Sequence, residues 1–294
     1  MMENTAYELE ALAKYTDYIG GQKPHSRILL QAFLPLFIEK FRLLQELQGH
    51  QQTFPMDRLK FENGIPLIQQ FQLFHRHDPW KQIAISAARA IAQGFPALKE
   101  DMRVLEEQVE TGGMDCYDFF QDSSSDQDDL RLMTWAVRYS VSSAALGFFL
   151  KTVEHFLLCK RAADMKESLA PLAWNKGYCP VCASMPMLAI TREQGRQWLQ
   201  CSRCSHEWTF PRLACPACNH TSPEDTTYLY IEGNPDESVF VCENCKKYLI
   251  TAHQETSLQA ARCPEVLAIS LAHLDLILQG KGYDRMAVCD WNTL

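Results

Sequence analysis

The sequence predicts an α+β protein with an N-terminal all-helical bundle, two tandem metal knuckle units of the zinc-ribbon kind, and a C-terminal helix. Apolar residues recur at helical spacing over the first part of the 294-residue chain, up to about Leu172. Four CxxC pairs then follow among short strand-like runs. Helical spacing returns between Glu265 and Gly280. The predicted domains are a helical domain, a double CxxC ribbon, and a C-terminal helix and tail packing on the rest: 1–172, 173–255 and 256–294.

The bundle is expected to contain two helices with clear signals. The first carries apolar residues at helical spacing, and Pro35 should kink or divide it because proline removes a backbone donor. Its apolar residues are Leu30, Phe33, Leu34, Phe37, Phe41 and Leu44. The second begins after Asp78, an N-cap followed by Pro79 at the first helical position, and ends before Pro96. Its buried face is expected to consist of Ile83, Ala87, Ile91 and Phe95.

Two further helices complete the helical prediction. The acidic, serine-rich tract from Asp122 to Asp129 is typical of a solvated loop that ends by capping a helix, because carboxylates favour a helix start. That helix should run from Leu132 to about Lys166, since apolar spacing continues through it. The last helix, from Glu265 to Gly280, is expected to pack back on the bundle.

The region of the cysteine pairs has the pattern of two β-ribbons, each a pair of short strand-like runs around a turn. In the first ribbon the runs are Met187–Ile190 and Gln197–Gln200, with a turn at 193–196. In the second they are Thr226–Ile231 and Val239–Val241, with a turn at 233–235, and Tyr248–Thr251 follows. Each ribbon is expected to hold one metal site.

Eight of the twelve cysteines form the four CxxC pairs and are the predicted metal ligands. The pairs are Cys179 with Cys182, Cys201 with Cys204, Cys215 with Cys218, and Cys242 with Cys245, separated by 18, 10 and 23 residues. Each long gap contains its own hairpin pattern, so we expect the first pair to join the second (site 1) and the third to join the fourth (site 2). A cross-braced arrangement, first with third, is the alternative.

Two four-cysteine sites would bind two metal ions. The main effect of these ions would be to stabilise the fold. A tetrahedral set of four sulfurs accepts zinc or iron, and the sequence does not separate the two metals. Such a site leaves no position for water, which argues against metal-assisted hydrolysis. Structural zinc contributes on the order of 10–16 kcal/mol to folding. Thiol exchange is disfavoured, because the pattern supplies no helix start beside a CxxC pair.

Length, composition and charge exclude several classes of protein. A chain with 47% hydrophobic residues can bury a sizeable core, so disorder of the whole chain is not expected. The net charge of −8 disfavours non-specific binding to nucleic acid. The N-terminal residues do not resemble a signal peptide, and the most apolar stretch, Tyr139 to Leu150, is shorter than the roughly 20 residues of a membrane span. We therefore expect a cytoplasmic protein without membrane insertion.

Other residues that could carry chemistry have simpler roles. His206 and His220 follow ligand cysteines, but both sites are complete without them. The polar run from His75 to Asp78 fits a loop. The remaining cysteines are expected to be small buried hydrophobes, and two tryptophans near the knuckles are expected to pack in the core. These residues are Cys116, Cys159, Cys263, Cys289, Trp198 and Trp208.

From Lys176 to about Arg285 the sequence resembles the formate dehydrogenase accessory (formation) protein family, FdhE. The matching segments are Cys179–Pro186, Cys201–Cys204 with Glu207–Trp208, Cys215–Cys218, Cys242–Cys245 with Tyr248–Leu249, Leu274–Asp275 and Gly282–Tyr283. The family usually has glycine after the second cysteine of each knuckle, where this chain has Ala183, Ser205, Asn219 and Lys246. A β-carbon in a left-handed conformation costs about 1–2 kcal/mol.

The resemblance implies a cytoplasmic accessory protein, not an enzyme, that is required to produce active respiratory formate dehydrogenase. It implies binding to the catalytic subunit of that enzyme and rubredoxin-like iron centres on the eight paired cysteines, with no catalytic residues to assign. Two alternatives come from other classes. A zinc-ribbon nucleic-acid-binding protein is allowed by the CxxC spacing but opposed by the acidic charge. A rubredoxin-like electron-transfer protein would need bound iron that is reduced and reoxidised reversibly.

Overall fold

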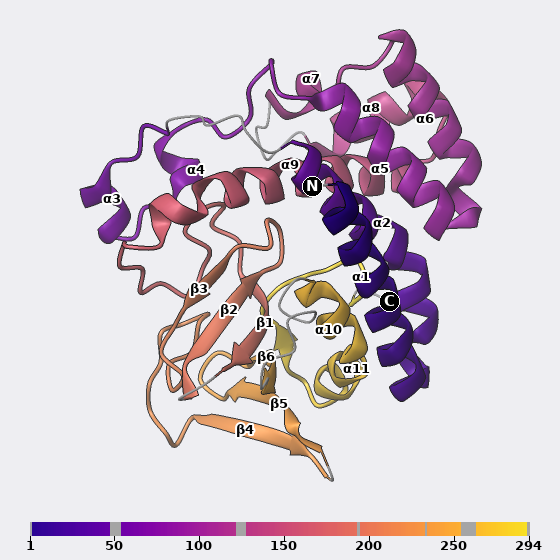
Figure 1. Ribbon diagram of the computed structural model, residues 1–294. Coiled ribbons are helices and arrows are strands. Elements are labelled where there is room, and N and C mark those ends of the chain that lie inside the picture. The colour runs from indigo at the N-terminus through magenta and orange to yellow at the C-terminus, as the bar shows by residue number, and fades with distance from the viewer. Residues whose placement is uncertain are drawn as a thin grey trace. The chain divides into compact units, whose positions relative to one another are not determined.

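A computed structural model describes residues 2–47, 54–121, 128–192, 195–232, 234–253 and 263–292. The chain forms two compact units, each assembled from segments far apart in the sequence (Figure 1). Unit 1 comprises Met1–Leu9, Gln31–His50 and Gln72–Lys160. Unit 2 comprises Glu10–Leu30, Gln51–Phe71 and Arg161–Leu294. The domain bounds proposed from the sequence stay a prediction.

The α+β class is confirmed, and in the described part of the chain helices precede and follow one β-sheet. The helices are α1 (Met2–Gln22), α2 (Arg27–Glu46), α3 (Arg58–Glu62), α4 (Leu67–Gln70), α5 (Trp80–Gly94), α6 (Lys99–Thr111), α7 (Cys116–Gln121), α8 (Asp128–Tyr139), α9 (Ser143–Leu169), α10 (Pro264–Ser270) and α11 (His273–Gly280). The strands are β1 (Pro186–Thr191), β2 (Gln197–Cys201), β3 (Glu207–Thr209), β4 (Thr226–Ile231), β5 (Asn234–Cys242), β6 (Lys247–His253) and β7 (Asp284–Arg285).

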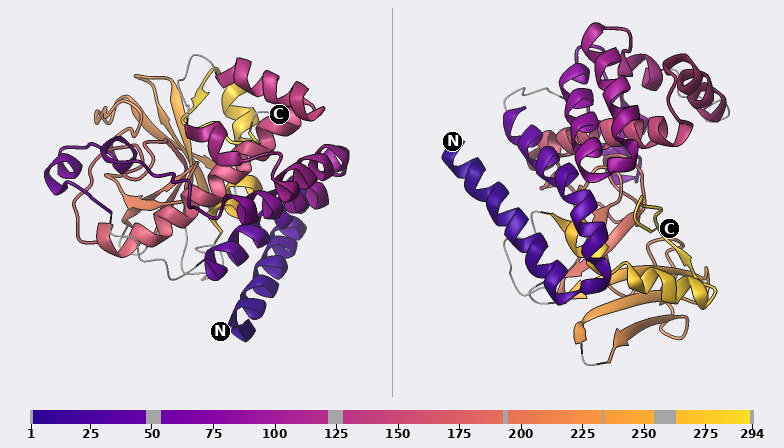
Figure 2. Two further views of the ribbon diagram at one scale, coloured as in Figure 1. Left: turned by 90° about the horizontal axis from the view of Figure 1, so that it is seen from above. Right: turned by 90° about the vertical axis from the view of Figure 1, so that its right-hand side faces the viewer.

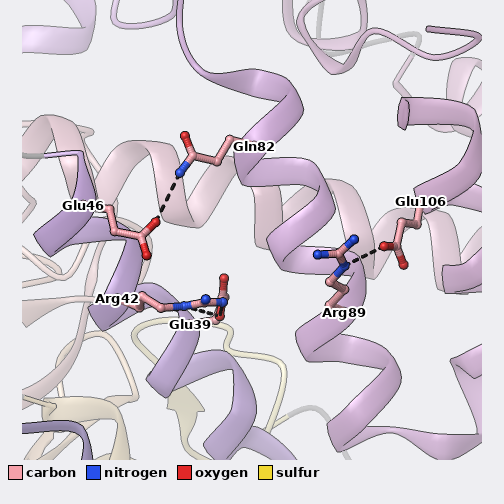
Figure 3. Close-up of polar contacts among 6 residues, drawn as sticks. All are labelled: Glu39, Arg42, Glu46, Gln82, Arg89 and Glu106. Atoms are coloured by element: carbon pink, nitrogen blue, oxygen red, sulfur yellow. Dashed lines mark hydrogen bonds and ion pairs between the residues drawn. The ribbon is translucent and has the colours of Figure 1, made fainter. Parts of the chain in front are cut away.

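Helices α5 and α6 pack together in unit 1, and α2, which is not divided at Pro35, contacts α5. A β-carbon on Gly94, the last residue of α5, would lie 2.0 Å from the carbonyl oxygen of Ala32 in α2. Only glycine therefore allows this approach. Polar contacts link the exposed sides of these helices, including Gln82 with Glu46 at 3.2 Å and Arg89 with Glu106 at 2.6 Å (Figure 3).

The start of α5 differs from the prediction. The helix begins at Trp80, and the Asp78 carboxylate accepts a hydrogen bond from the backbone N–H of His75 at 2.7 Å instead of capping the helix. The predicted inner face is correct for Ile83, Ala87 and Ile91, which are fully buried. The apolar spacing identified the face because it depends only on the helical period.

The single helix predicted from Leu132 to Lys166 is wrong, because the chain breaks into α8 and α9 at an angle of 109°. Ser140 adopts a left-handed conformation with φ 55°, which ends α8. The Ser142 hydroxyl then accepts a hydrogen bond from the Ala145 N–H at 3.1 Å and caps α9. Residues 122–127 of the loop predicted from Asp122 to Asp129 lie outside the described residues, and its last two residues already belong to α8.

Among the described residues, no single helix is both long and apolar enough to cross a membrane. The bent pair of α8 and α9 reaches the required length and composition only when the two helices are taken together.

The two predicted ribbons are joined in one sheet in unit 2. The strand order is β3-β2-β1-β6-β5-β4, with β7 also paired to β6. Within each ribbon the strands are antiparallel, and the ribbons meet where β1 and β6 run parallel, with Ala189 opposite Thr251 and Thr191 opposite His253. The sheet therefore connects both groups of cysteines.

Two C-terminal helices, α10 and α11, take the place of the single predicted helix, and they pack against this sheet (Figures 1 and 2). Leu267, Leu271 and Leu274 belong to one buried cluster with residues of β1, β5 and β6. The Tyr248 hydroxyl in β6 also donates a hydrogen bond to the Asp275 carboxylate in α11 at 2.6 Å. The hydrogen bond between Tyr248 and Asp275 thus links two of the sequence segments that carry the family resemblance.

Candidate metal centres

The first group of cysteines, called centre 1, lies at the β1–β2 ribbon. It consists of Cys179, Cys182, Cys201 and Cys204, whose sulfur atoms all lie within 4.8 Å of one another. The sulfurs of Cys179 and Cys204 are 3.5 Å apart, and those of Cys182 and Cys201 are 3.4 Å apart. Pro186 at the start of β1 pairs with Cys201 at the end of β2, so strand pairing brings the two knuckles together.

The second group, called centre 2, lies at the β4–β5–β6 ribbon. It consists of Cys215, Cys218, Cys242 and Cys245, again within 4.8 Å of one another. The sulfurs of Cys215 and Cys245 are 3.7 Å apart, as are those of Cys218 and Cys242. The fourth knuckle is the tight connection between β5 and β6. The structure thus groups the eight cysteines by sequential pairing of the knuckles, not by the cross-braced alternative.

These sulfur separations fit a metal ion better than disulfide bonds. A disulfide places two sulfurs about 2.05 Å apart. Four thiolates around an ion with metal–sulfur bonds of about 2.3 Å form a tetrahedron whose edge is roughly 3.8 Å. The observed distances of 3.4–3.7 Å lie close to that edge. Each group therefore has the donor type, number and spacing of a tetrahedral four-sulfur site.

Each knuckle is a tight turn that ends in a left-handed residue. The residue after the second cysteine has a positive φ in all four knuckles: 65° at Ala183, 54° at Ser205, 59° at Asn219 and 56° at Lys246. In the first knuckle the Ala183 N–H donates to the carbonyl of Cys179 at 3.0 Å, and Asn219 bonds Cys215 in the same way. Glycine would adopt this conformation without cost, which accounts for the preference for glycine that the resemblance implies at these positions.

Replacing Ala183 with glycine is expected to stabilise the metal-loaded protein by about 0.5–1 kcal/mol. The left-handed β-carbon costs about 1–2 kcal/mol, and the greater freedom of glycine in the unfolded chain offsets about 0.5–1 kcal/mol of the gain. Asn219→Gly is the matched control and should change stability little, since asparagine tolerates this conformation. Urea unfolding of both variants measures the difference, and a loss of stability in Ala183→Gly would contradict this account of the turn.

Within each centre, burial and hydrogen bonds shift the pKa values of different thiols in opposite directions. In centre 1, burial raises the pKa of Cys179 and of Cys204 well above that of a free thiol, while hydrogen bonds from neighbouring cysteines lower the pKa of Cys182. In centre 2, burial raises the pKa of Cys245 to about 11. Burial also acts on Cys218, but hydrogen bonds led by the Asn244 amide lower its pKa to about 7. A coordinated metal ion would deprotonate all four thiols.

Centre 1 is covered by a segment that no sequence motif marked. The N–H groups of Leu67 and Ile68 donate to the carbonyls of Pro180 and Val181 in the first knuckle, both at 2.9 Å. The Tyr178 hydroxyl donates to the carbonyl of Gly64 at 2.7 Å. Segment 64–68 is thereby bonded directly to the first knuckle.

The second knuckle of centre 1 is attached to α10. The Ser205 hydroxyl donates to the buried carboxylate of Glu265 at 2.6 Å. Trp208 is buried in the core as predicted, and its indole N–H donates to the carbonyl of Lys176 at 3.0 Å. Glu265 was not anticipated from the sequence, because an acidic residue in the first turn of a helix has an ordinary explanation there.

Centre 2 is held from outside by polar side chains. Glu243, inside the fourth knuckle, accepts hydrogen bonds from Tyr283 and from Lys246. The Asn244 side-chain amide approaches the Cys218 sulfur at 3.5 Å and joins the third knuckle to the fourth. The position of Asn244 between two predicted ligand cysteines was the one signal in the sequence that could have identified it.

Among the described residues, both groups of possible ligands consist of cysteine alone, and neither includes the histidines weighed from the sequence. His220 lies 2.7 Å from the carboxylate of Asp225. Burial lowers the pKa of His206 to about 4, so this imidazole is neutral at pH 7. The other four cysteines are buried and lie outside both centres, as predicted. His75 and His77 stack on each other in unit 1.

Residues 178–212, which contain centre 1, match the family described as "FdhE, central domain". The chain is 34% identical over 140 residues to a protein FdhE homolog of Stutzerimonas stutzeri, a match that covers 45% of this chain and 42% of that relative. It is 24% identical over 262 residues to the homolog of Proteus mirabilis, covering 86% of this chain and 79% of that relative. The chain thus spans less than half the length of the first relative.

The fold is also found in a solved structure. The crystal structure of the FdhE protein from Pseudomonas aeruginosa covers 98% of this chain with a TM-score of 0.54 and 22% sequence identity, and the match covers 94% of that protein. Family, relatives and fold agree with the resemblance expected from the cysteine knuckles and their neighbouring residues. The chain is similar to FdhE proteins in its central cysteine region, in the relatives it matches and in its fold.

Proposed function

We propose that this protein is a cytoplasmic accessory protein, without catalytic activity of its own, that is needed to form active respiratory formate dehydrogenase. It binds the catalytic subunit of that enzyme and carries two metal ions, iron or zinc, one in each four-cysteine centre. The observation that supports this most is the pair of compact four-sulfur groups in a chain that is similar to FdhE proteins.

Coordination chemistry supports the part of the proposal that gives the metal ions no catalytic role. A metal ion that catalyses hydrolysis needs an open position for water or substrate beside its protein ligands. Four sulfurs at tetrahedral separations would fill the coordination shell of each ion, and each group among the described residues contains four cysteines. The metal ions would therefore stabilise the ribbons and fix their surfaces for a partner.

Co-purification tests the partner. The tagged protein, expressed with the catalytic subunit of formate dehydrogenase, should retain that subunit through washing at 0.5 M salt, chosen because roughly this concentration screens non-specific charge contacts. Loss of the gene should abolish formate oxidation by the respiratory enzyme, and the plasmid-borne gene should restore it. A tagged protein that never retains the subunit, in cells where both are soluble and abundant, would refute the partnership.

One alternative has an observation in its favour. Two cysteines of centre 2 are partly exposed, as an electron-transfer centre requires for access by a redox partner. That function predicts bound iron with a visible spectrum that bleaches on reduction and returns on oxidation. Colourless, stably bound zinc would exclude it. Binding to nucleic acid is opposed by the net charge of −8.

A further inference from the structure

The two metal centres differ in how far solvent reaches their sulfur atoms. In centre 1 all four cysteines are buried, with at most 2% of any residue exposed. In centre 2, Cys215 and Cys242 are equally buried, but Cys218 and Cys245 are partly exposed. The exposed cysteines come from different knuckles, so solvent reaches both halves of centre 2.

The contacts that cover the two centres also leave centre 2 more open to solvent than centre 1. Centre 1 is closed by backbone hydrogen bonds from Leu67 and Ile68 to the first knuckle and, at the second, by the bond from Ser205 to the buried carboxylate of Glu265. Around centre 2, some of the side chains that contact the knuckles are exposed to solvent. Glu243 and Lys246, which pair across the fourth knuckle, have 40% and 61% of their side chains exposed.

This difference governs how a metal ion can leave. A chelator removes an ion from a four-sulfur site stepwise, by binding the metal as individual thiolates detach and take up protons from water. At a partly exposed site this can begin in the folded protein. At a buried site the covering segment must first open, and local opening carries a free-energy cost that slows every later step.

We propose that centre 2 is an exchange site, which gives up and takes back its metal ion while the protein stays folded, and that centre 1 retains its ion. The exchange partner is a small thiol or aminocarboxylate ligand able to reach Cys218 and Cys245. In the reaction the ligand takes the divalent ion, four metal–sulfur bonds break, and the released thiolates are protonated according to the pH. This inference rests on the metal binding proposed above.

The test uses the whole protein loaded with zinc and checked first for two ions per chain. A chromophoric zinc chelator is added in excess, and zinc release is followed by absorbance. The expected trace has two phases of equal amplitude, with rates at least tenfold apart. Maleimide added after the fast phase should label Cys215, Cys218, Cys242 and Cys245, and leave Cys179, Cys182, Cys201 and Cys204 unlabelled, as peptide mass spectrometry would show.

A surface variant links the fast phase to centre 2. Asn244→Ala removes the amide beside the Cys218 sulfur, and it should accelerate the fast phase roughly threefold without changing the slow one. Glu224→Ala changes an exposed side chain on the loop between the third and fourth knuckles and should leave both phases unchanged.

Three results would overturn the inference. Release in one phase means that the centres are equivalent, and labelling of the centre 1 cysteines first means that the order is reversed. In both cases a protein that began with two zinc ions still supports the proposed metal binding. A protein that holds no metal in either centre contradicts both this inference and the proposed metal binding on which it rests.

Discussion

Replacing Gly177 with alanine is expected to destabilise unit 2 by about 3 kcal/mol, the upper end of the usual range for overpacking. A β-carbon at this position would lie 2.0 Å from the carbonyl oxygen of Pro216 and 2.5 Å from its Cα and carbonyl carbon. All three are backbone atoms, which cannot turn aside as a flexible side chain can. The chain must therefore shift at one of the two knuckles that these residues adjoin.

The consequence of Gly177→Ala should extend to both metal centres. Gly177 lies two residues before Cys179 of centre 1, and Pro216 lies between the two cysteines of the third knuckle in centre 2. We expect the midpoint of denaturant unfolding to fall and zinc affinity to weaken at both centres. Competition with a chelator of known affinity measures the second effect.

Gly21→Ala is the matched control for Gly177→Ala. Gly21 lies in α1, and a β-carbon there would meet no atom within 4 Å. Alanine should raise stability by up to about 1 kcal/mol, because it favours a helix more than glycine does. If Gly177→Ala proved as harmless as Gly21→Ala, the close contact between the two knuckles would be wrong.

Replacing Cys182 with serine should have the second large effect, loss of one of the two metal ions. Serine keeps the shape of the side chain but offers a poor ligand for a soft site, so only three thiolates remain in a buried centre. Because a structural zinc ion contributes on the order of 10–16 kcal/mol to folding, unit 2 should lose most of its stability. Elemental analysis should find one ion per chain, and thermal unfolding should begin at a much lower temperature.

Cys116→Ser separates loss of a ligand from loss of a buried thiol. Cys116 is 2% exposed and lies in unit 1, outside both centres. The substitution buries a hydroxyl and should cost about 1–3 kcal/mol, but it should leave two metal ions per chain. If the Cys116 and Cys182 variants lost the same amount of metal, the assignment of Cys182 as a ligand would fail.

The grouping of the cysteines could be predicted because it depends on local structure. A CxxC pair at each end of a hairpin is brought together by strand pairing, and the runs around residues 187–200 and 226–251 have a clear strand pattern. Apolar spacing likewise identified the buried face of α5. Both signals come from residues close together in the sequence.

The breaks in the predicted helices could not be found in this way. Apolar spacing continues through Ser140 and through residues 271–272, although the helices end there. A left-handed serine changes the direction of the chain without changing the pattern of apolar residues, so the period alone cannot show it. The Ser142 hydroxyl donates a hydrogen bond to the carboxylate of Asp101, a residue far away in the sequence.

Contacts between distant segments could not be predicted from the sequence either. The parallel pairing of β1 with β6 joins the two ribbons into one sheet. Nothing about Ala189 in the sequence indicates that it pairs with Thr251. The bonds of Leu67 and Ile68 to the first knuckle use backbone groups, which any residue type supplies. The difference in exposure between centres 1 and 2 depends on these contacts and therefore emerges only from the structure.

X-ray absorption at the metal edge, on protein purified without oxygen, tests the two four-sulfur centres most directly. The account predicts two metal ions per chain, each surrounded by four sulfur atoms at about 2.3 Å, with no nitrogen or oxygen neighbour. A spectrum that requires oxygen or nitrogen ligands, or fewer than four sulfurs around an ion, would contradict it.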